Sequence, residues 1–168
     1  KWTADGSQAA LWIHANDNKD RWIATIDFDE MQLVSQHRLT DEAWVNNYHG
    51  EFGWLRDNRT IWFISEDHGY LGIYTKHVDE RRSKALVKGG YVVNDPALGP
   101  SGEYIYYHAN VDYPGIYEVW RVNVQSGRQE QLTNLGGFST AVVSPDESKL
   151  LITHSVHARH EELYVQDN

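Results

Sequence analysis

The sequence predicts an all-β fold: a β-propeller fragment of about four blades, each a four-stranded antiparallel sheet, with the last blade incomplete. Three observations lead to this prediction. Segments made of a turn and a strand recur at a nearly constant spacing, and continuous apolar runs follow the turns. In addition, 7 Trp, 10 Tyr and 4 Phe among 168 residues supply the aromatic side chains that strands favour. No helical period of useful length appears anywhere.

The spacing of the turns defines the repeat. Three turns contain Asp57, Ser101 and Asp146, which lie 44 and 45 residues apart along the chain. A further copy contains Asp5, which lies 52 residues before Asp57, so we expect an insertion in the first repeat. In the third copy, residues 99–102 read Gly-Pro-Ser-Gly, which suits a type I turn with proline in its second position. A period of about 40 to 50 residues is typical of propeller blades.

Each copy then contains the strands expected of a blade. The apolar run after the turn does not alternate, which predicts a strand covered on both faces. These runs are residues 9–13, 61–64, 104–107 and 150–152. The following strands are expected at 22–26, 71–74, 116–122 and 163–165, with a last strand at 32–39, 84–90 and 129–137 in the first three copies. We therefore expect one partial domain, residues 1–168, with blades at about 1–45, 46–91, 92–138 and 139–168.

An ordinary β-sandwich is the alternative fold, and the fixed phase of the repeat argues against it. A propeller closes a ring of typically about 4 to 8 blades, so that the face of every blade has a neighbour. We therefore expect this chain to be part of a larger propeller, or an open half-ring with adhesive end faces. The missing initiator Met and the single Met31 also indicate part of something longer.

Composition excludes several classes of function. The net charge of −9, with 15 basic and 24 acidic side chains, argues against a nucleic-acid partner. The absence of cysteine excludes disulfides, cysteine-ligated zinc and thiol nucleophiles. No apolar run is long enough for a transmembrane helix, and any signal peptide or anchor is expected outside this sequence.

We expect no catalytic, metal or cofactor site among these residues. No serine lies in the Gly-x-Ser-x-Gly pattern of a nucleophile elbow, and there is no glycine-rich phosphate or dinucleotide loop. His154, His157 and His160 are spaced by three residues, but we expect them in a solvated connection between two strands rather than at a metal ion.

Several segments resemble the propeller of dipeptidyl peptidase IV-like enzymes, serine exopeptidases of the prolyl oligopeptidase superfamily. They are residues 38–45 (RLTDEAWV), 51–55 (EFGWL), 61–74 (IWFISEDHGYLGIY), 85–93 (ALVKGGYVV) and 102–107 (GEYIYY). The resemblance implies that the chain shapes and gates the chamber for short peptide substrates. It also implies a partner domain, a C-terminal α/β-hydrolase domain of the same polypeptide that holds the catalytic Ser, Asp and His. A periplasmic, secreted or membrane-anchored location is implied as well, whereas monomer and dimer both stay open.

The same resemblance assigns a substrate-binding role to one segment of this chain. In the family, the segment matching residues 44–49 extends toward the active site, where its aromatic side chain helps to line the extended S2 subsite. That position falls on Tyr48, with His49 beside it in place of an arginine. Packing of Tyr48 between blades is the alternative interpretation.

Two other functions stay open at this stage. A non-catalytic TolB-like propeller, acting as a protein-binding scaffold, would have the same repeat. Carbohydrate binding through surface tryptophans is the weaker alternative, because most of the Trp residues fall in or beside expected strands, where core packing is the default.

Overall fold

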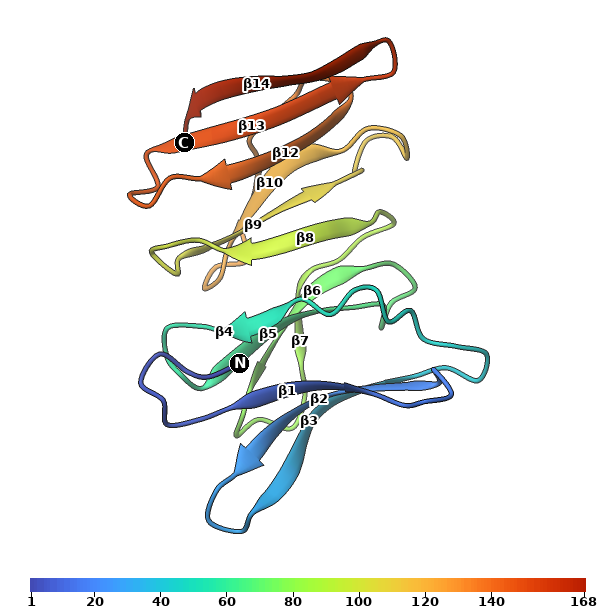
Figure 1. Cartoon of the computed structure of the whole chain (residues 1–168), viewed down its shortest axis with the longest axis vertical. Helices are drawn as coiled ribbons and strands as arrows, with labels where there is room; N and C mark the ends of the chain where they lie inside the picture. The colour runs from blue at the N-terminus through green and yellow to red at the C-terminus, as the bar shows by residue number, and fades with distance from the viewer. The chain divides into compact units, whose positions relative to one another are not determined.

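The computed structural model describes residues 1–168 and contains strands and turns but no helix (Figure 1). The all-β prediction is thereby confirmed. None of its segments forms a helix that is long and apolar enough to cross a membrane. The strands are β1 (Ala10–His14), β2 (Asp20–Asp27), β3 (Gln32–Thr40), β4 (Phe52–Trp54), β5 (Thr60–Ser65), β6 (Gly72–His77), β7 (Lys84–Val87), β8 (Val93–Leu98), β9 (Tyr104–Ala109), β10 (Glu118–Asn123), β11 (Gln129–Gln131), β12 (Phe138–Val143), β13 (Lys149–Val156) and β14 (Arg159–Asp167).

These strands form four sheets in which each strand pairs with its neighbour in sequence. The strand orders are β1-β2-β3, β4-β5-β6-β7, β11-β10-β9-β8 and β12-β13-β14. The last sheet is incomplete, as predicted. The first sheet differs from the prediction because it has three strands rather than four. In place of the expected first strand, the structure has a single bridge between Trp2 and Ala9.

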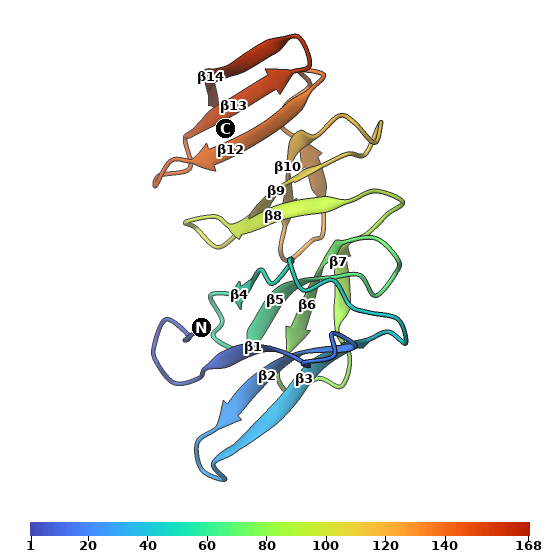
Figure 2. The same ribbon diagram turned by 45° about the vertical axis from the view of Figure 1, so that its right-hand side comes forward.

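The chain divides into two compact units. The first contains residues 1–69 and 73–85, and the second contains residues 70–72 and 86–168. The first two sheets lie in the first unit, except for Gly72 and the last two residues of β7, and the other two sheets lie in the second. Both views of the second unit show β12 beside the sheet that contains β9 and β10, and these strands are in contact (Figure 2).

The repeated turns share one backbone geometry. The residue that follows the turn Asp or Ser has a positive φ in every copy: Gly6 (72°), Asn58 (55°), Gly102 (76°) and Glu147 (56°). Gly and Asn adopt this conformation at little cost, whereas Glu147 needs support from its surroundings. Its carboxylate accepts hydrogen bonds from the N–H and the hydroxyl of Ser101 at 3.0 and 2.8 Å. Likewise, Asn58 Oδ1 accepts a hydrogen bond from the N–H of Ala4 at 3.2 Å. In each unit, therefore, a side chain of the second repeated turn accepts a hydrogen bond from the first repeated turn.

A shared apolar core joins the two sheets of each unit. In the first unit, buried side chains of both sheets form one cluster: Ala10, Ile23, Phe52, Trp54, Ile61, Phe63 and Tyr74. In the second unit, Tyr106 of one sheet packs against Leu150 and Ile152 of the other. The fully buried Ile61, Ile105 and Leu150 belong to the apolar runs that follow the repeated turns. The runs of the second and third copies are therefore core strands, as their lack of alternation predicted, whereas Leu11 in the run of the first copy is 37% exposed.

One face of the fourth sheet departs from that prediction, because no part of this chain covers it. Val142, Leu151 and Val165 are neighbours across β12, β13 and β14, and they are 68%, 45% and 71% exposed. Their side chains form an exposed apolar patch on this face.

The last strands of the second and third copies are shorter than predicted. β7 ends at Val87 rather than at residue 90, and β11 ends at Gln131 rather than at residue 137. Gly136, with a φ of 72°, lies in the connection to the next sheet. The second strand of the fourth copy is longer than predicted, since β13 continues to Val156 and takes His154 out of the expected connection.

The connection from β11 to β12 is held by a buried carboxylate. Glu118 on β10 is 3% exposed and accepts hydrogen bonds from the N–H groups of Leu135 and Gly136 at 2.8 and 2.7 Å. Its other oxygen accepts from the Thr133 hydroxyl at 2.5 Å. Charge-assisted hydrogen bonds of this kind are stronger than neutral ones, so one side chain fixes the path of six residues, 132–137.

We expect Glu118→Ala to lower the free energy of unfolding by about 3–5 kcal/mol, because it leaves several buried donors without an acceptor. The control, Glu130→Ala, removes a carboxylate from the neighbouring β11 that pairs with Arg121 at 2.9 Å and is 49% exposed. That change should cost no more than about 1 kcal/mol. Urea unfolding of both variants measures the difference, and equal losses would contradict the role of Glu118.

Candidate functional site

The segment expected to contact substrate is the connection between β3 and β4, residues 41–51. It has no regular secondary structure, and side chains within it fix its turns. Asp41 Oδ1 accepts hydrogen bonds from the N–H groups of Ala43 and Trp44 at 2.7 and 3.2 Å. Asn46 Oδ1 accepts from the N–H of Tyr48 at 3.0 Å. Short polar side chains next to a turn commonly bond to the backbone in this way. Asp41 and Asn46 therefore fix the local backbone of the segment at two places before β4.

A buried arginine anchors this segment to the first unit. Arg21, the second residue of β2, is 3% exposed. Its Nη1 donates to the carbonyls of Asn46 and His49 at 3.2 and 2.6 Å, and its Nη2 donates to the carbonyl of Ile64 at 3.1 Å. Burial lowers the pKa of Arg21, and the carboxylates of Glu66, Asp67 and Glu51 oppose this shift. An arginine stays charged under such conditions, so it offers a fixed fork of donors to the backbone carbonyls.

The neighbouring β-turn of residues 15–18 gives a second anchor. The N–H of Val45 donates to the carbonyl of Asn18 at 2.6 Å, and Asn47 Nδ2 donates to Asn18 Oδ1 at 2.8 Å. Val45 is itself 3% exposed. Backbone and side-chain contacts thus hold the segment on both sides of Trp44 and Tyr48.

The two predicted substrate-binding residues lie near the end of this anchored segment. Tyr48 is 91% exposed, so most of its surface faces solvent. His49 is half-buried, and its carbonyl is one of the acceptors of Arg21. Trp44, a third aromatic side chain of the segment, is 62% exposed. The structure therefore offers an aromatic side chain to solvent on a backbone that is held in place.

Two cavities flank the segment. One, of about 270 Å³, is lined by Asn18, Trp44, Val45, Asn47 and Tyr48. Asn47 Oδ1 is buried and has no hydrogen-bond partner. The second cavity, of about 460 Å³, shares Trp44 and Val45 with the first and continues to Asp41, Glu66 and Asp67. The exposed aromatic rings beside these cavities suit a ligand that carries an apolar group.

A Ser–His–Asp cluster lies nearby, but it lacks the geometry of a catalytic triad. His37 Nε2 lies 3.4 Å from both Ser65 Oγ and Asp67 Oδ2. In a triad, the base uses one ring nitrogen for the nucleophile and the other for the acid. Ser65 is also fully buried, and burial lowers the pKa of His37. The cluster therefore acts as part of the core.

The histidines near the C-terminus are likewise not assembled into a site. His154 is buried on β13, where its Nδ1 lies 3.0 Å from Ser139 Oγ, while His157 and His160 are exposed. No group of three or more histidine and carboxylate side chains is arranged to hold a metal ion.

Sequence reasoning missed Arg21 and Asn47. The only signal for Arg21 was a charged residue at the start of an otherwise apolar strand, residues 22–26. That signal does not identify the carbonyls it binds, because they lie 25 to 43 residues away in sequence. Asn47 gave no signal of its own, since asparagines are common in any connection.

A sequence-family profile, "Dipeptidyl peptidase IV (DPP IV) N-terminal region", matches residues 1–158. No curated protein sequence matches the chain.

Solved structures with the same fold include two peptidases and one TolB. A protein assigned as a dipeptidyl aminopeptidase IV from Bacteroides ovatus matches 99% of this chain with a TM-score of 0.82 and 14% identity. Dipeptidyl peptidase 4 of Porphyromonas gingivalis matches 96% with a TM-score of 0.78 and 16% identity. TolB from Acinetobacter baumannii matches 99% with a TM-score of 0.64 and 19% identity. The chain spans 27%, 23% and 39% of these proteins, respectively.

We expect Arg21→Ala to release the segment from the first unit. The change leaves three carbonyls without their donor, so the free energy of unfolding should fall by about 2–4 kcal/mol. Amide hydrogen exchange within residues 41–51 should accelerate more than exchange in β5. The control, Arg38→Ala, removes a 55% exposed arginine of β3 that pairs with Asp20 at 2.8 Å, and should cost less than about 1 kcal/mol. Unchanged exchange in Arg21→Ala would contradict the anchoring role.

Proposed function

Because the chain belongs to the family of dipeptidyl peptidase IV N-terminal regions, we propose that it is the propeller portion of a dipeptidyl peptidase IV-like serine exopeptidase. In this proposal the propeller forms one wall of the chamber that holds the substrate and admits only short peptides. Membership of the family implies that the full protein continues into a C-terminal hydrolase domain. That domain supplies the catalytic residues, and this chain alone has no peptidase activity.

The proposed reaction is acyl transfer in the hydrolase domain. A histidine takes the proton of the serine hydroxyl as the oxygen attacks the carbonyl of the second peptide bond of the substrate. The tetrahedral intermediate collapses, the histidine returns the proton to the leaving amine, and the N-terminal dipeptide stays on the serine as an ester. Water then attacks the ester with the same histidine as base, which releases the dipeptide. The propeller contributes by holding the peptide in place for this attack.

One observation carries the proposed role of the propeller residues: Tyr48 is 91% exposed and lies between Asn46 and His49, whose carbonyls accept hydrogen bonds from Arg21. We assign Tyr48, with His49 beside it, to the wall of the pocket for the N-terminal side chain of the peptide. An aromatic ring buries apolar area against such a side chain while its hydroxyl keeps contact with water. Anchoring of the backbone supports this role, because little further ordering is needed on binding.

A protein-binding scaffold of the TolB kind is the second candidate. The fold similarity to the TolB of Acinetobacter baumannii supports it, although the family match favours the peptidase. The full-length gene separates the two functions, since only the peptidase requires a downstream Gly-x-Ser-x-Gly motif.

We expect Tyr48→Ala in the full-length protein to raise KM about 3- to 10-fold for Phe-Pro-p-nitroanilide, because an aromatic contact is lost. For Gly-Pro-p-nitroanilide, which has no side chain at that position, KM should stay within about twofold. Tyr48→Phe should retain most of the wild-type preference. Steady-state kinetics with both substrates measure the change in KM for each of them.

Tyr113→Ala serves as the control, because Tyr113 is 63% exposed but lies outside this segment. Its kinetics should match those of the wild type. Equal effects of Tyr48→Ala on both substrates would reject the pocket assignment. A full-length protein that releases no dipeptide from any substrate would reject the peptidase itself.

A further inference from the structure

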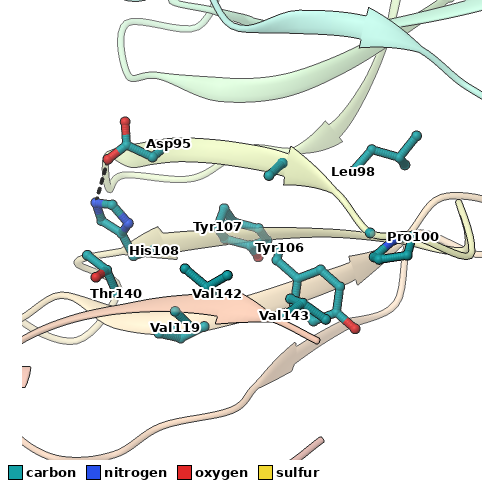
Figure 3. Close-up of a pocket in the computed structure, with 13 residues that line it drawn as sticks. Asp95, Leu98, Pro100, Tyr106, Tyr107, His108, Val119, Thr140, Val142 and Val143 are labelled. Carbon is teal, nitrogen blue, oxygen red and sulfur yellow. Dashed lines mark ion pairs between the residues drawn. The ribbon is translucent and has the colours of Figure 1, made fainter. Parts of the chain in front are cut away.

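One cavity of the second unit lies outside the segment described above. It has a volume of about 520 Å³ and is bounded by β8 and β9 on one side and by β12 on the other (Figure 3). Asp95, His108 and Thr140 lie at one end, and Leu98, Pro100 and Val143 lie at the other. The proposed peptidase function gives it no role.

The cavity runs along the free edge of β12. Four consecutive residues of this strand, 140–143, line it. Since successive side chains of a strand point to opposite faces, consecutive residues can share one cavity only when it follows the strand edge. β12 is the terminal strand of its sheet, and only the bridge between Tyr117 and Phe138 covers the start of its outer edge.

This edge presents unpaired backbone groups. The N–H of Ser139 donates to the carbonyl of Tyr117 at 2.8 Å, so it points away from β13. Backbone direction alternates along a strand, so the N–H and C=O groups of Ala141 and Val143 point the same way, into the cavity. Neither makes a backbone hydrogen bond on that side. Unpaired groups of this kind are a template for another strand.

The opposite wall does not offer the same template. β8 has an irregular register between Asn94 and Ala97, and Pro96 has no N–H to donate. Asp95 has a φ of 45°, which is strained for a residue that precedes proline. Bulges and prolines are devices that protect sheet edges from further pairing, whereas β12 reads Phe-Ser-Thr-Ala-Val-Val and has neither a proline nor a charge. Only the β12 side of the cavity is open to pairing.

The charge of the cavity is negative and confined to one end. Asp95 is the only acidic residue among those that line it, and its side chain is 76% exposed. Asp95 Oδ2 lies 3.4 Å from Nε2 of the buried His108 (Figure 3). Burial lowers the pKa of His108, so this imidazole is neutral at pH 7 and leaves the carboxylate uncompensated. A cationic group is the complement of this end.

We propose that β12 binds an extended peptide segment by strand addition, with a lysine side chain of that peptide at the Asp95 end of the cavity. The backbone of the peptide pairs with Ala141 and Val143, and apolar side chains fill the space beside Leu98 and Tyr106. This proposal does not rest on the peptidase function, because it uses the free edge, the blocked opposite wall and the charge of this cavity alone.

The test uses the full-length protein and a fluorescein-labelled peptide, N-acetyl-Lys-Thr-Val-Thr-Val-Thr, with binding followed by fluorescence anisotropy. In strand addition, only every second amide of the peptide faces β12. Methylation of the amides that face β12 should therefore abolish binding, whereas methylation of the amides that face away should leave binding unchanged. Ala141→Pro should weaken binding about tenfold or more through loss of the free N–H. It should leave the unfolding temperature within a few degrees, because that N–H has no partner in the folded chain.

Asp95→Asn should weaken binding of the lysine peptide about two- to fivefold, which corresponds to an exposed ion pair. It should not change binding of the norleucine analogue. Glu161→Gln, which removes an exposed carboxylate from β14, is the matched control and should have no effect. Failure to bind up to about 1 mM, or equal loss with both sets of methylated amides, overturns the proposal. Dimerisation without peptide that Ala141→Pro abolishes also overturns it, in favour of pairing between two copies.

Discussion

The structure depends on one constraint: a sheet of three or four strands cannot cover its own apolar face. Each repeated turn delivers a strand whose side chains are apolar on both faces, so a sheet is stable only when another packs on it. The fully buried Ile61 and Leu150 lie in the second sheet of their units and are covered by the first. On the face of the fourth sheet that no other sheet covers, the apolar side chains of Val142 and Val165 stay exposed to solvent.

Face-to-face packing alone does not fix the connections between sheets, and here each unit uses a buried charge. Arg21 and Glu118 stand at the start of corresponding strands, β2 and β10, and both are 3% exposed. Arg21 donates to carbonyls of the connection that leads to the next sheet, whereas Glu118 accepts from N–H groups of the equivalent connection. The two side chains have opposite charges because one connection presents carbonyl groups to Arg21 and the other presents N–H groups to Glu118. Burial of a charge is tolerated in both cases because the backbone satisfies it.

Features set by local sequence could be predicted, and features set by distant contacts could not. The turns at Asp57, Ser101 and Asp146 have local causes, and the repeat they define led to the all-β sheets and their order. The choice of Tyr48 as a candidate came from the resemblance to a family segment. Its exposure could not be predicted, because exposure depends on the whole surrounding surface. The hydrogen-bond partners of Arg21 could not be predicted either, because they are carbonyl groups of residues that are distant in sequence.

The exposure of Tyr48 and the free edge of β12 follow from the same architecture. When neighbouring sheets pack face to face, their apolar side chains are buried between them. The surfaces left for contacts with other molecules are then the connections and the strand edges. A connection such as residues 41–51 can hold an exposed aromatic ring in place only if its backbone is bound elsewhere, because a mobile loop would lose its freedom on binding. A strand edge needs no such support, since its ladder already fixes every second N–H and C=O group toward the outside. The anchored loop therefore suits recognition of a side chain, whereas the edge suits recognition of a peptide backbone.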